Sequence, residues 1–175
     1  LLERWSGAED YRARVPGMPQ DALHVMIEQQ VQKTPQNKAL ECNGKHLTYS
    51  EMWGQTSDAA AVLQSKGVGI GSIVALMTDR SIEMVVGMLS ILRAGGAYAP
   101  FAPKMPADRL TFMAEDCHCR VVLTTESYVE LAKSIRVECV LRLGTSDVVA
   151  GTGVTFTAPN VTQTDTMLCL YTSGS

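Results

Sequence analysis

Between residues 50 and 143, segments with apolar residues at helical spacing alternate with short apolar runs of strand length. The clearest run is 72–78 (SIVALMT), whose uninterrupted apolar centre is typical of a strand buried on both faces. Residues 120–124 (RVVLT) and 138–143 are the next runs of this kind. Because the connections between these segments are short, the alternation predicts an α/β fold with alternating helices and a largely parallel sheet.

Residues that favour helix ends and turns give the boundaries of the other predicted elements. Asp21, Ser50 and Ser81 are expected to cap helices, because their side chains can accept hydrogen bonds from N–H groups of the first turn. Asn43-Gly44 is the strongest two-residue signal for a β-hairpin. The predicted helices span 22–33, 51–66, 82–94, 106–116 and 126–134. The remaining predictions are a hairpin of 39–42 and 45–49, a short extended segment at 98–101, irregular chain over 144–165 with at most an edge strand at 154–156, and a final strand over Met167–Tyr171.

Charge and cysteine content exclude several classes of partner. The net charge of −3 and the pI of about 5.6 argue against a nucleic-acid-binding surface. The apolar stretches fall well short of the ~20 residues that a membrane-spanning helix needs, and residues 1–12 carry charge where a signal peptide is apolar. The odd number of cysteines, five, predicts free thiols in a reducing compartment. We therefore expect a cytoplasmic protein with neither a nucleic acid nor a membrane as its partner.

The run Cys117-His118-Cys119 is the one stretch that suggests a metal site. Structural zinc ligands are usually two to four residues apart and are joined by a second ligand pair. Here one residue separates the two thiols, and no second pair is apparent. We therefore expect no metal site and predict a junction between a helix and a strand, with partly buried thiols.

Thr172, Ser173, Gly174 and Ser175 form the candidate binding site. They follow the last apolar run, and hydroxyl groups, backbone N–H groups and a glycine at a strand end can wrap a phosphate. A polar turn after a strand has the same composition, so these four residues alone leave both interpretations open. The Gly-x-Gly-x-x-Gly dinucleotide fingerprint, the Walker sequence and the Gly-x-Ser-x-Gly nucleophile elbow are absent from the sequence.

Three motifs, in order along the chain, resemble one enzyme family. Residues 47–52 (LTYSEM) resemble a first core motif, Leu-Thr-Tyr-x-Glu-Leu. Residues 92–100 (LRAGGAYAP) resemble a second, Leu-Lys-Ala-Gly-x-Ala-Tyr-Val-Pro. Residues 170–175 (LYTSGS) match the start of a third, which continues as Thr-Gly-x-Pro-Lys-Gly in the family. Together with 80–84 and 106–110, they are similar to the N-terminal part of an adenylation domain of a nonribosomal peptide synthetase, in the adenylate-forming, AMP-binding superfamily.

The resemblance implies an activity and the residues that support it. Such domains activate an amino acid or a related carboxylic acid with ATP and Mg²⁺, releasing pyrophosphate. They then transfer the acyl group to the phosphopantetheine thiol of a peptidyl carrier domain. The resemblance implies that Thr172, Ser173, Gly174 and Ser175 hold the phosphates of ATP. It places no catalytic residue and no metal ligand in these 175 residues, because the family's other functional residues follow the third motif.

The resemblance also implies a domain organisation. Position 1 is not Met, and the sequence ends within the third motif. We expect residues 1–20 to be a leading segment or an interdomain linker, which follows a condensation domain in multidomain synthetases. Residues 21–175 are expected to be a partial N-terminal subdomain, truncated in the phosphate-binding loop and inactive by itself. Two alternatives stay open: an acyl- or aryl-CoA ligase of the same superfamily, and a non-catalytic truncated module that binds a neighbouring domain.

Overall fold

The computed structural model describes residues 21–151, 153–162 and 164–172. Its core is a four-stranded sheet in the order β4-β3-β5-β6, and each pair of neighbouring strands is parallel. The strands are β3 (Ile73–Met77), β4 (Ala97–Pro100), β5 (Val121–Thr124) and β6 (Cys139–Arg142). The predicted α/β fold with a largely parallel sheet is therefore confirmed.

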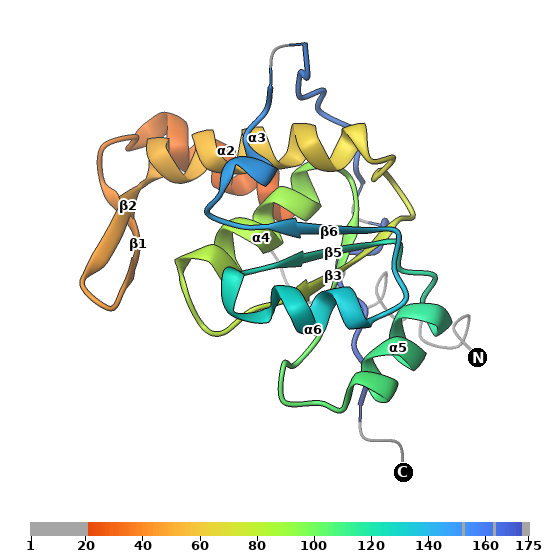
Figure 1. The fold of residues 1–175 in the computed structure, drawn as a ribbon. Helices are drawn as coiled ribbons and strands as arrows, with labels where there is room; N and C mark the ends of the chain where they lie inside the picture. The colour runs from red at the N-terminus through yellow and green to blue at the C-terminus, as the bar shows by residue number, and fades with distance from the viewer. Residues whose placement is uncertain (1–20, 152, 163, 173–175) are drawn as a thin grey trace.

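Helices cover both faces of this sheet (Figure 1). They are α3 (Tyr49–Ser65), α4 (Ile82–Arg93), α5 (Ala107–Asp116) and α6 (Val129–Ser134), the last preceded by the single turn η2 (Glu126–Tyr128). Successive residues of β3 point to opposite faces, so Val74 and Leu76 pack with α3 and α4, whereas Ala75 and Met77 pack with α5 and α6. This burial on both sides explains the uninterrupted apolar run in the sequence.

A further layer packs against α3 and α4 on the side away from the sheet. Its apolar cluster centres on Met52 of α3 and on Val86 and Leu89 of α4. The elements of this layer are α2 (Leu23–Lys33) and the antiparallel hairpin of β1 (Lys38–Cys42) and β2 (Lys45–Thr48). Asn43 and Gly44 join the two strands with φ angles of 50° and 75°, the left-handed conformation that an Asn-Gly hairpin turn requires. The hairpin prediction is confirmed.

The N-terminal cap of α3 is Thr48, so the prediction of Ser50 was wrong. The Thr48 hydroxyl accepts a hydrogen bond from the Glu51 N–H at 3.2 Å, and the Glu51 carboxylate accepts one from the Thr48 N–H at 2.8 Å. This reciprocal arrangement is a capping box, which satisfies two backbone donors at once. It lowers the pKa of Glu51, because both the backbone N–H and the hydroxyl of Thr48 bind the ionised carboxylate.

Of the other two predicted helix caps, Ser81 is confirmed and Asp21 is not. Ser81 caps α4 as predicted, and its hydroxyl accepts from the Met84 N–H at 3.2 Å. The cap position of α2 is Ala22, which provides no side-chain hydrogen bond. Asp21 lies one residue earlier, and its carboxylate instead accepts from the side-chain amide of Gln29 at 2.9 Å. The Asp21 prediction was therefore wrong by one position.

The chain after β6 is largely irregular, as predicted. It contains the single turn η3 (Ser146–Val148) and has no strand over 154–156. Side-chain bonds fix part of it: the amide of Gln64 donates to the Thr157 carbonyl at 2.7 Å and accepts from the Thr157 N–H at 3.1 Å. Within the residues that the structure describes, no helix is both long enough and apolar enough to cross a membrane.

Candidate functional site

The carboxyl ends of the parallel strands all lie at the same end of the sheet, where open α/β sheets typically bind ligands. Polar side chains beyond these ends pair with one another. The Tyr128 hydroxyl donates to Asp79 Oδ2 at 2.6 Å, and this bond raises the pKa of Tyr128. Arg142 donates to both oxygens of Asp147, at 2.7 and 3.1 Å, and to Glu126 at 3.1 Å. Each of these side chains therefore has a hydrogen-bond partner within the fold.

Residues 167–171 run alongside β4 and in the same direction as that strand. The Tyr98 N–H donates to the Met167 carbonyl at 3.1 Å, and the Cys169 N–H donates to the Tyr98 carbonyl at 3.0 Å. One parallel bridge, between Tyr98 and Leu168, is all that forms of the strand predicted over Met167–Tyr171. Both of these backbone bonds are made by Tyr98, so the pairing does not extend along the segment as a ladder would. Because it runs parallel to β4, the segment leads the chain toward the carboxyl ends of the sheet's strands.

Tyr171 anchors the end of this segment on α5. Its hydroxyl donates to Asp116 Oδ2 at 2.6 Å and to the Met113 carbonyl at 3.2 Å. Burial, followed by the bond to Asp116, raises the pKa of Tyr171, so the phenol stays a neutral donor. Thr172 follows with an exposed side chain. The other candidate residues lie outside the described part of the chain; they are Ser173, Gly174 and Ser175.

The second motif, 92–100, builds the tight passage from α4 to β4. Gly95 has a φ of 93°, and a Cβ there would lie 3.1 Å from Pro159 Cγ and 3.2 Å from the Ile70 nitrogen. A Cβ on Gly96 would lie 3.0 Å from Val68 Cγ1. The paired glycines therefore allow backbone and side chains to approach more closely than any other residue would. This part of the motif has a structural role.

The fold and these motifs agree with comparisons to known proteins. A sequence model described as "AMP-binding enzyme" matches residues 27–175. The chain belongs to this family. Similar proteins include tyrocidine synthase 3 of Brevibacillus parabrevis, 36% identical over 95% of this chain and 3% of the relative. Surfactin synthase subunit 2 of Bacillus subtilis (strain 168) is 39% identical over 88% of this chain and 4% of the relative.

Solved structures support the same family. The nonribosomal peptide synthetase FmoA3 with α-methyl-L-serine-AMP bound superposes with a TM-score of 0.80 at 25% identity, covering 91% of this chain and 18% of that one. The chain thus spans a small part of each of these proteins. The resemblance to a nonribosomal peptide synthetase adenylation domain is confirmed at the level of the family.

Arg93 lies between two aromatic rings and was not singled out from the sequence. Its guanidinium lies 3.6 Å from the ring centroid of Trp53 and 4.8 Å from that of Phe156. It donates to the Trp53 carbonyl at 2.8 Å and to Thr56 Oγ1 at 2.6 Å. Burial lowers the pKa of Arg93 to about 10, and the Glu28 carboxylate acts in the opposite direction. Arg93 therefore stays charged near neutral pH and joins α3, α4 and the later loop.

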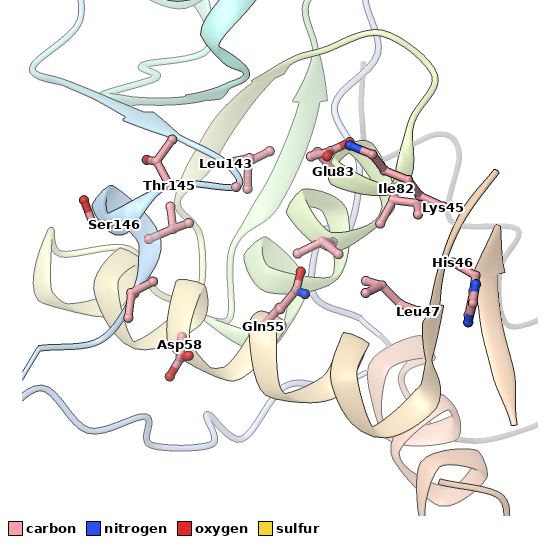
Figure 2. A pocket seen from close by; sticks show the side chains of 14 residues that line it. Lys45, His46, Leu47, Gln55, Asp58, Ile82, Glu83, Leu143, Thr145 and Ser146 are labelled. Atoms are coloured by element: carbon pink, nitrogen blue, oxygen red, sulfur yellow. The ribbon is translucent and has the colours of Figure 1, made fainter. Parts of the chain in front are cut away.

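A cavity of about 720 Å³ lies between the hairpin, α3, the start of α4 and the chain after β6 (Figure 2). Leu47 and Gln55 point inward, whereas His46 points away (Figure 2). No local sequence pattern predicts this cavity, because its walls come from four separate segments. In the described ranges, no three or more His, Cys, Asp or Glu side chains gather closely enough to hold a metal ion.

The predicted junction of helix and strand at Cys117–Cys119 is confirmed. Cys117 is the cap residue at the end of α5, His118 has a φ of 52°, and Cys119 is buried just before β5. All five cysteines are free thiols. Cys119, Cys117 and Cys169 belong to the apolar cluster between the sheet, α5 and α6.

Proposed function

We propose that this chain is part of the N-terminal subdomain of an amino-acid-activating adenylation domain, and that Thr172, Ser173, Gly174 and Ser175 hold phosphates of ATP. The observation that carries the proposal is the path of residues 167–171, which run parallel to β4 and are anchored on α5 through Tyr171. This path leads the chain through Thr172 toward the carboxyl ends of the parallel strands, where open α/β sheets typically bind ligands.

The chemistry of these four residues fits a phosphate. Hydroxyl and backbone N–H groups are donors, and the phosphate oxygens accept from them, while glycine lets the backbone approach closely. The exposed Thr172 is free to turn toward a ligand, since its neighbour Tyr171 supplies the anchoring bonds. Magnesium would accompany ATP, and we assign it no ligand among the described residues.

The proposed reaction is the activation of a carboxylic acid. A carboxylate oxygen of the amino acid attacks the α-phosphorus of ATP, and the bond from that phosphorus to the departing pyrophosphate breaks. The role of residues 172–175 is to position the phosphates and to balance the charge that develops on the leaving group. The acyl group then passes to a phosphopantetheine thiol on a carrier domain. The names of the relatives, synthases of tyrocidine and surfactin, support an amino acid as substrate.

The domain organisation forms part of this proposal. Residues 21–175 would be a segment of the larger subdomain, with residues 1–20 as a leading segment or a linker behind a condensation domain. The segment alone is expected to be inactive, because the residues named here bind phosphate and none of them is assigned to the chemical step. The match of the family model to residues 27–175 supports a boundary near the start of α2.

Amino-acid-dependent ATP–pyrophosphate exchange tests the proposal. The 175-residue chain should show no exchange, and a longer protein that carries the complete adenylation domain should show it. In that longer protein, Ser173→Ala should reduce exchange by about 10- to 100-fold, the value of one hydrogen bond to a charged group. Ser134→Ala on α6 is the matched control, since its hydroxyl only donates to the Leu131 carbonyl.

Three results would contradict the proposal. Exchange by the 175-residue chain above background would refute its predicted inactivity. An unchanged rate in Ser173→Ala would remove the phosphate role. Exchange that depends on fatty or aryl acids and not on amino acids would favour the acyl- or aryl-CoA ligase alternative.

A further inference from the structure

The segment 167–171 is held at both of its ends before the chain reaches Thr172. Near its start, two backbone hydrogen bonds join it to Tyr98. At its end, the Tyr171 hydroxyl donates to Asp116 Oδ2 at 2.6 Å. Thr172 follows with an exposed side chain and makes no hydrogen bond to another residue that the structure describes. Tyr171 is therefore the last fixed point before the four proposed phosphate-binding residues.

The hydrogen bond between Tyr171 and Asp116 belongs to a strong class. Bonds from a hydroxyl to a carboxylate are typically about 2.5–2.7 Å long and about twice as strong as bonds between neutral groups. The longer contact of the same hydroxyl, 3.2 Å to the Met113 carbonyl, is also made to α5. This helix is itself fixed in the core, where Leu110, Met113 and Ala114 are buried. The phenol is therefore attached to a rigid element and not to a loop.

Helix stability does not explain an acidic side chain at position 116. Asp116 is the last residue of α5, and the last turn of this helix contains no basic residue. The carboxyl end of a helix carries partial negative charge, which repels a carboxylate. Glu115, the other acid of this turn, pairs with Arg136 at 3.6 Å, whereas no ion pair among the described residues includes Asp116. Tyr171 is therefore the partner that the described structure gives to this carboxylate.

We propose that Tyr171 and Asp116 are positioning residues for ATP, because their hydrogen bond fixes the chain immediately before the phosphate-binding residues. This inference rests on the proposed function of residues 172–175. Neighbouring Cα atoms are about 3.8 Å apart, so a displacement of Tyr171 is passed directly to Thr172. A shift of about 1 Å in a group that positions a substrate can lower a rate by about 100-fold. Tyr171 and Asp116 act through the chain that follows them and are not assigned a contact with ATP.

The contribution of this bond should appear in the binding of ATP. With the bond in place, the chain before Thr172 is ordered before ATP arrives. Without it, ATP binding has to order this part of the chain, and the lost conformational freedom weakens binding. Once ATP is bound, the phosphate-binding residues lie in the same place in both cases, so the chemical step changes little. The KM for ATP should therefore rise, whereas kcat and the KM for the amino acid should stay close to their original values.

The experiment measures amino-acid-dependent ATP–pyrophosphate exchange in a longer protein that carries the complete adenylation domain. Tyr171→Phe and Asp116→Ala should each raise the KM for ATP by about tenfold, the lower end of the value of one hydrogen bond to a charged group. Both should leave kcat and the KM for the amino acid within about threefold. The double variant should resemble either single variant, because both changes remove the same bond. Asp116→Asn keeps an acceptor oxygen and should restore most of the affinity for ATP.

Two control variants separate this bond from the general loss of a hydroxyl or a charge. Tyr49→Phe removes a phenol hydroxyl in the apolar cluster around Met52, and Asp108→Ala removes an acid from the first turn of α5. Both should leave the KM for ATP within about twofold. Asp108→Ala should also lower the midpoint of thermal unfolding more than Asp116→Ala, because an acid is favourable at the amino end of a helix and unfavourable at its carboxyl end. A purely structural role for Asp116 predicts the opposite pattern, a lower midpoint with an unchanged KM.

The possible results distinguish this proposal from the proposed function. An unchanged KM for ATP in both Tyr171→Phe and Asp116→Ala would overturn the positioning role. If Ser173→Ala still loses exchange in that case, the phosphate role stands; if Ser173→Ala is also unchanged, both proposals fail. An equal rise in the KM values of ATP and the amino acid would likewise overturn the positioning role, because it indicates a general disturbance of the domain. If Tyr171→Phe fails to fold, the two Asp116 variants decide, since that side chain is exposed.

Discussion

Replacing Arg93 by Met and Trp53 by Leu, singly and together, measures the contact that joins α3 to α4. The guanidinium lies 3.6 Å from the Trp53 centroid, and Arg93 is 4% exposed, so the cation is desolvated although Trp53 is only half-buried. A desolvated cation over Trp contributes about 2 kcal/mol or more. Trp53→Leu keeps both hydrogen bonds of Arg93, because these go to the Trp53 backbone and to Thr56. The double-mutant cycle therefore isolates the contact with the ring.

The assay is urea unfolding of the four proteins, with the free energy of unfolding extrapolated to water. Each single substitution should lower this free energy by about 2–4 kcal/mol, since a buried large side chain or charged donor is lost. The coupling energy should be about 2 kcal/mol. The matched control is the cycle of Arg93→Met with Phe156→Leu, which should give about 1 kcal/mol or less, because that ring lies 4.8 Å away. A Trp53 coupling below about 0.5 kcal/mol would refute the reasoning.

Three further predictions concern pH, packing and capping. Burial, then Arg93, lowers the pKa of His24 below 6.5 in the folded protein. The unfolded chain therefore binds more protons, and the free energy of unfolding should fall as the pH drops below about 6.5. Urea titrations at several pH values should show a smaller loss in the His24→Gln variant. Gly87→Ala should destabilise the protein by about 1–3 kcal/mol, because its Cβ would lie 2.8 Å from Leu76 Cδ1. Gly54→Ala lies in open space on α3 and should stabilise the protein by about 0.5–1 kcal/mol. Thermal unfolding compares the two variants, and equal effects would contradict the packing at Gly87. Thr48→Ala should lower the free energy of unfolding by about 1 kcal/mol, and Ser50→Ala should lower it much less. Denaturant midpoints measure both variants, and a larger loss in Ser50→Ala would contradict the assignment of the cap.

Hydrophobic pattern predicted the sheet well because burial on both faces leaves a continuous apolar run, as at 72–78. The cap of α3 was missed although its signal is present in the sequence. Thr48 is followed three residues later by Glu51, whereas Ser50 is followed by Trp53, and only the first spacing makes a capping box. The local sequence therefore contained the signal for Thr48, and the prediction chose Ser50, two residues later, in its place.

The site was predictable only where one stretch of chain carries it. The LYTSGS motif is local, and its family could be named from order and spacing. Arg93 between Trp53 and Phe156 depends on residues 40 and 63 positions away, which no short pattern reports. The large cavity likewise combines β2, α3, α4 and the chain after β6. The strand predicted at Met167–Tyr171 is reduced to one bridge with β4, because an apolar run does not by itself show how far pairing with a neighbour extends.

The single bridge to β4 has a consequence for the nascent protein. Met167 comes 67 residues after Pro100, the last residue of β4. At about 5–20 residues per second, a ribosome needs about 3–13 s to add that stretch. Until it has done so, the outer N–H and C=O groups of β4 lack their partner, and an open strand edge invites pairing with other chains. The interval between these two segments thus sets how long each newly made chain depends on dilution or a chaperone.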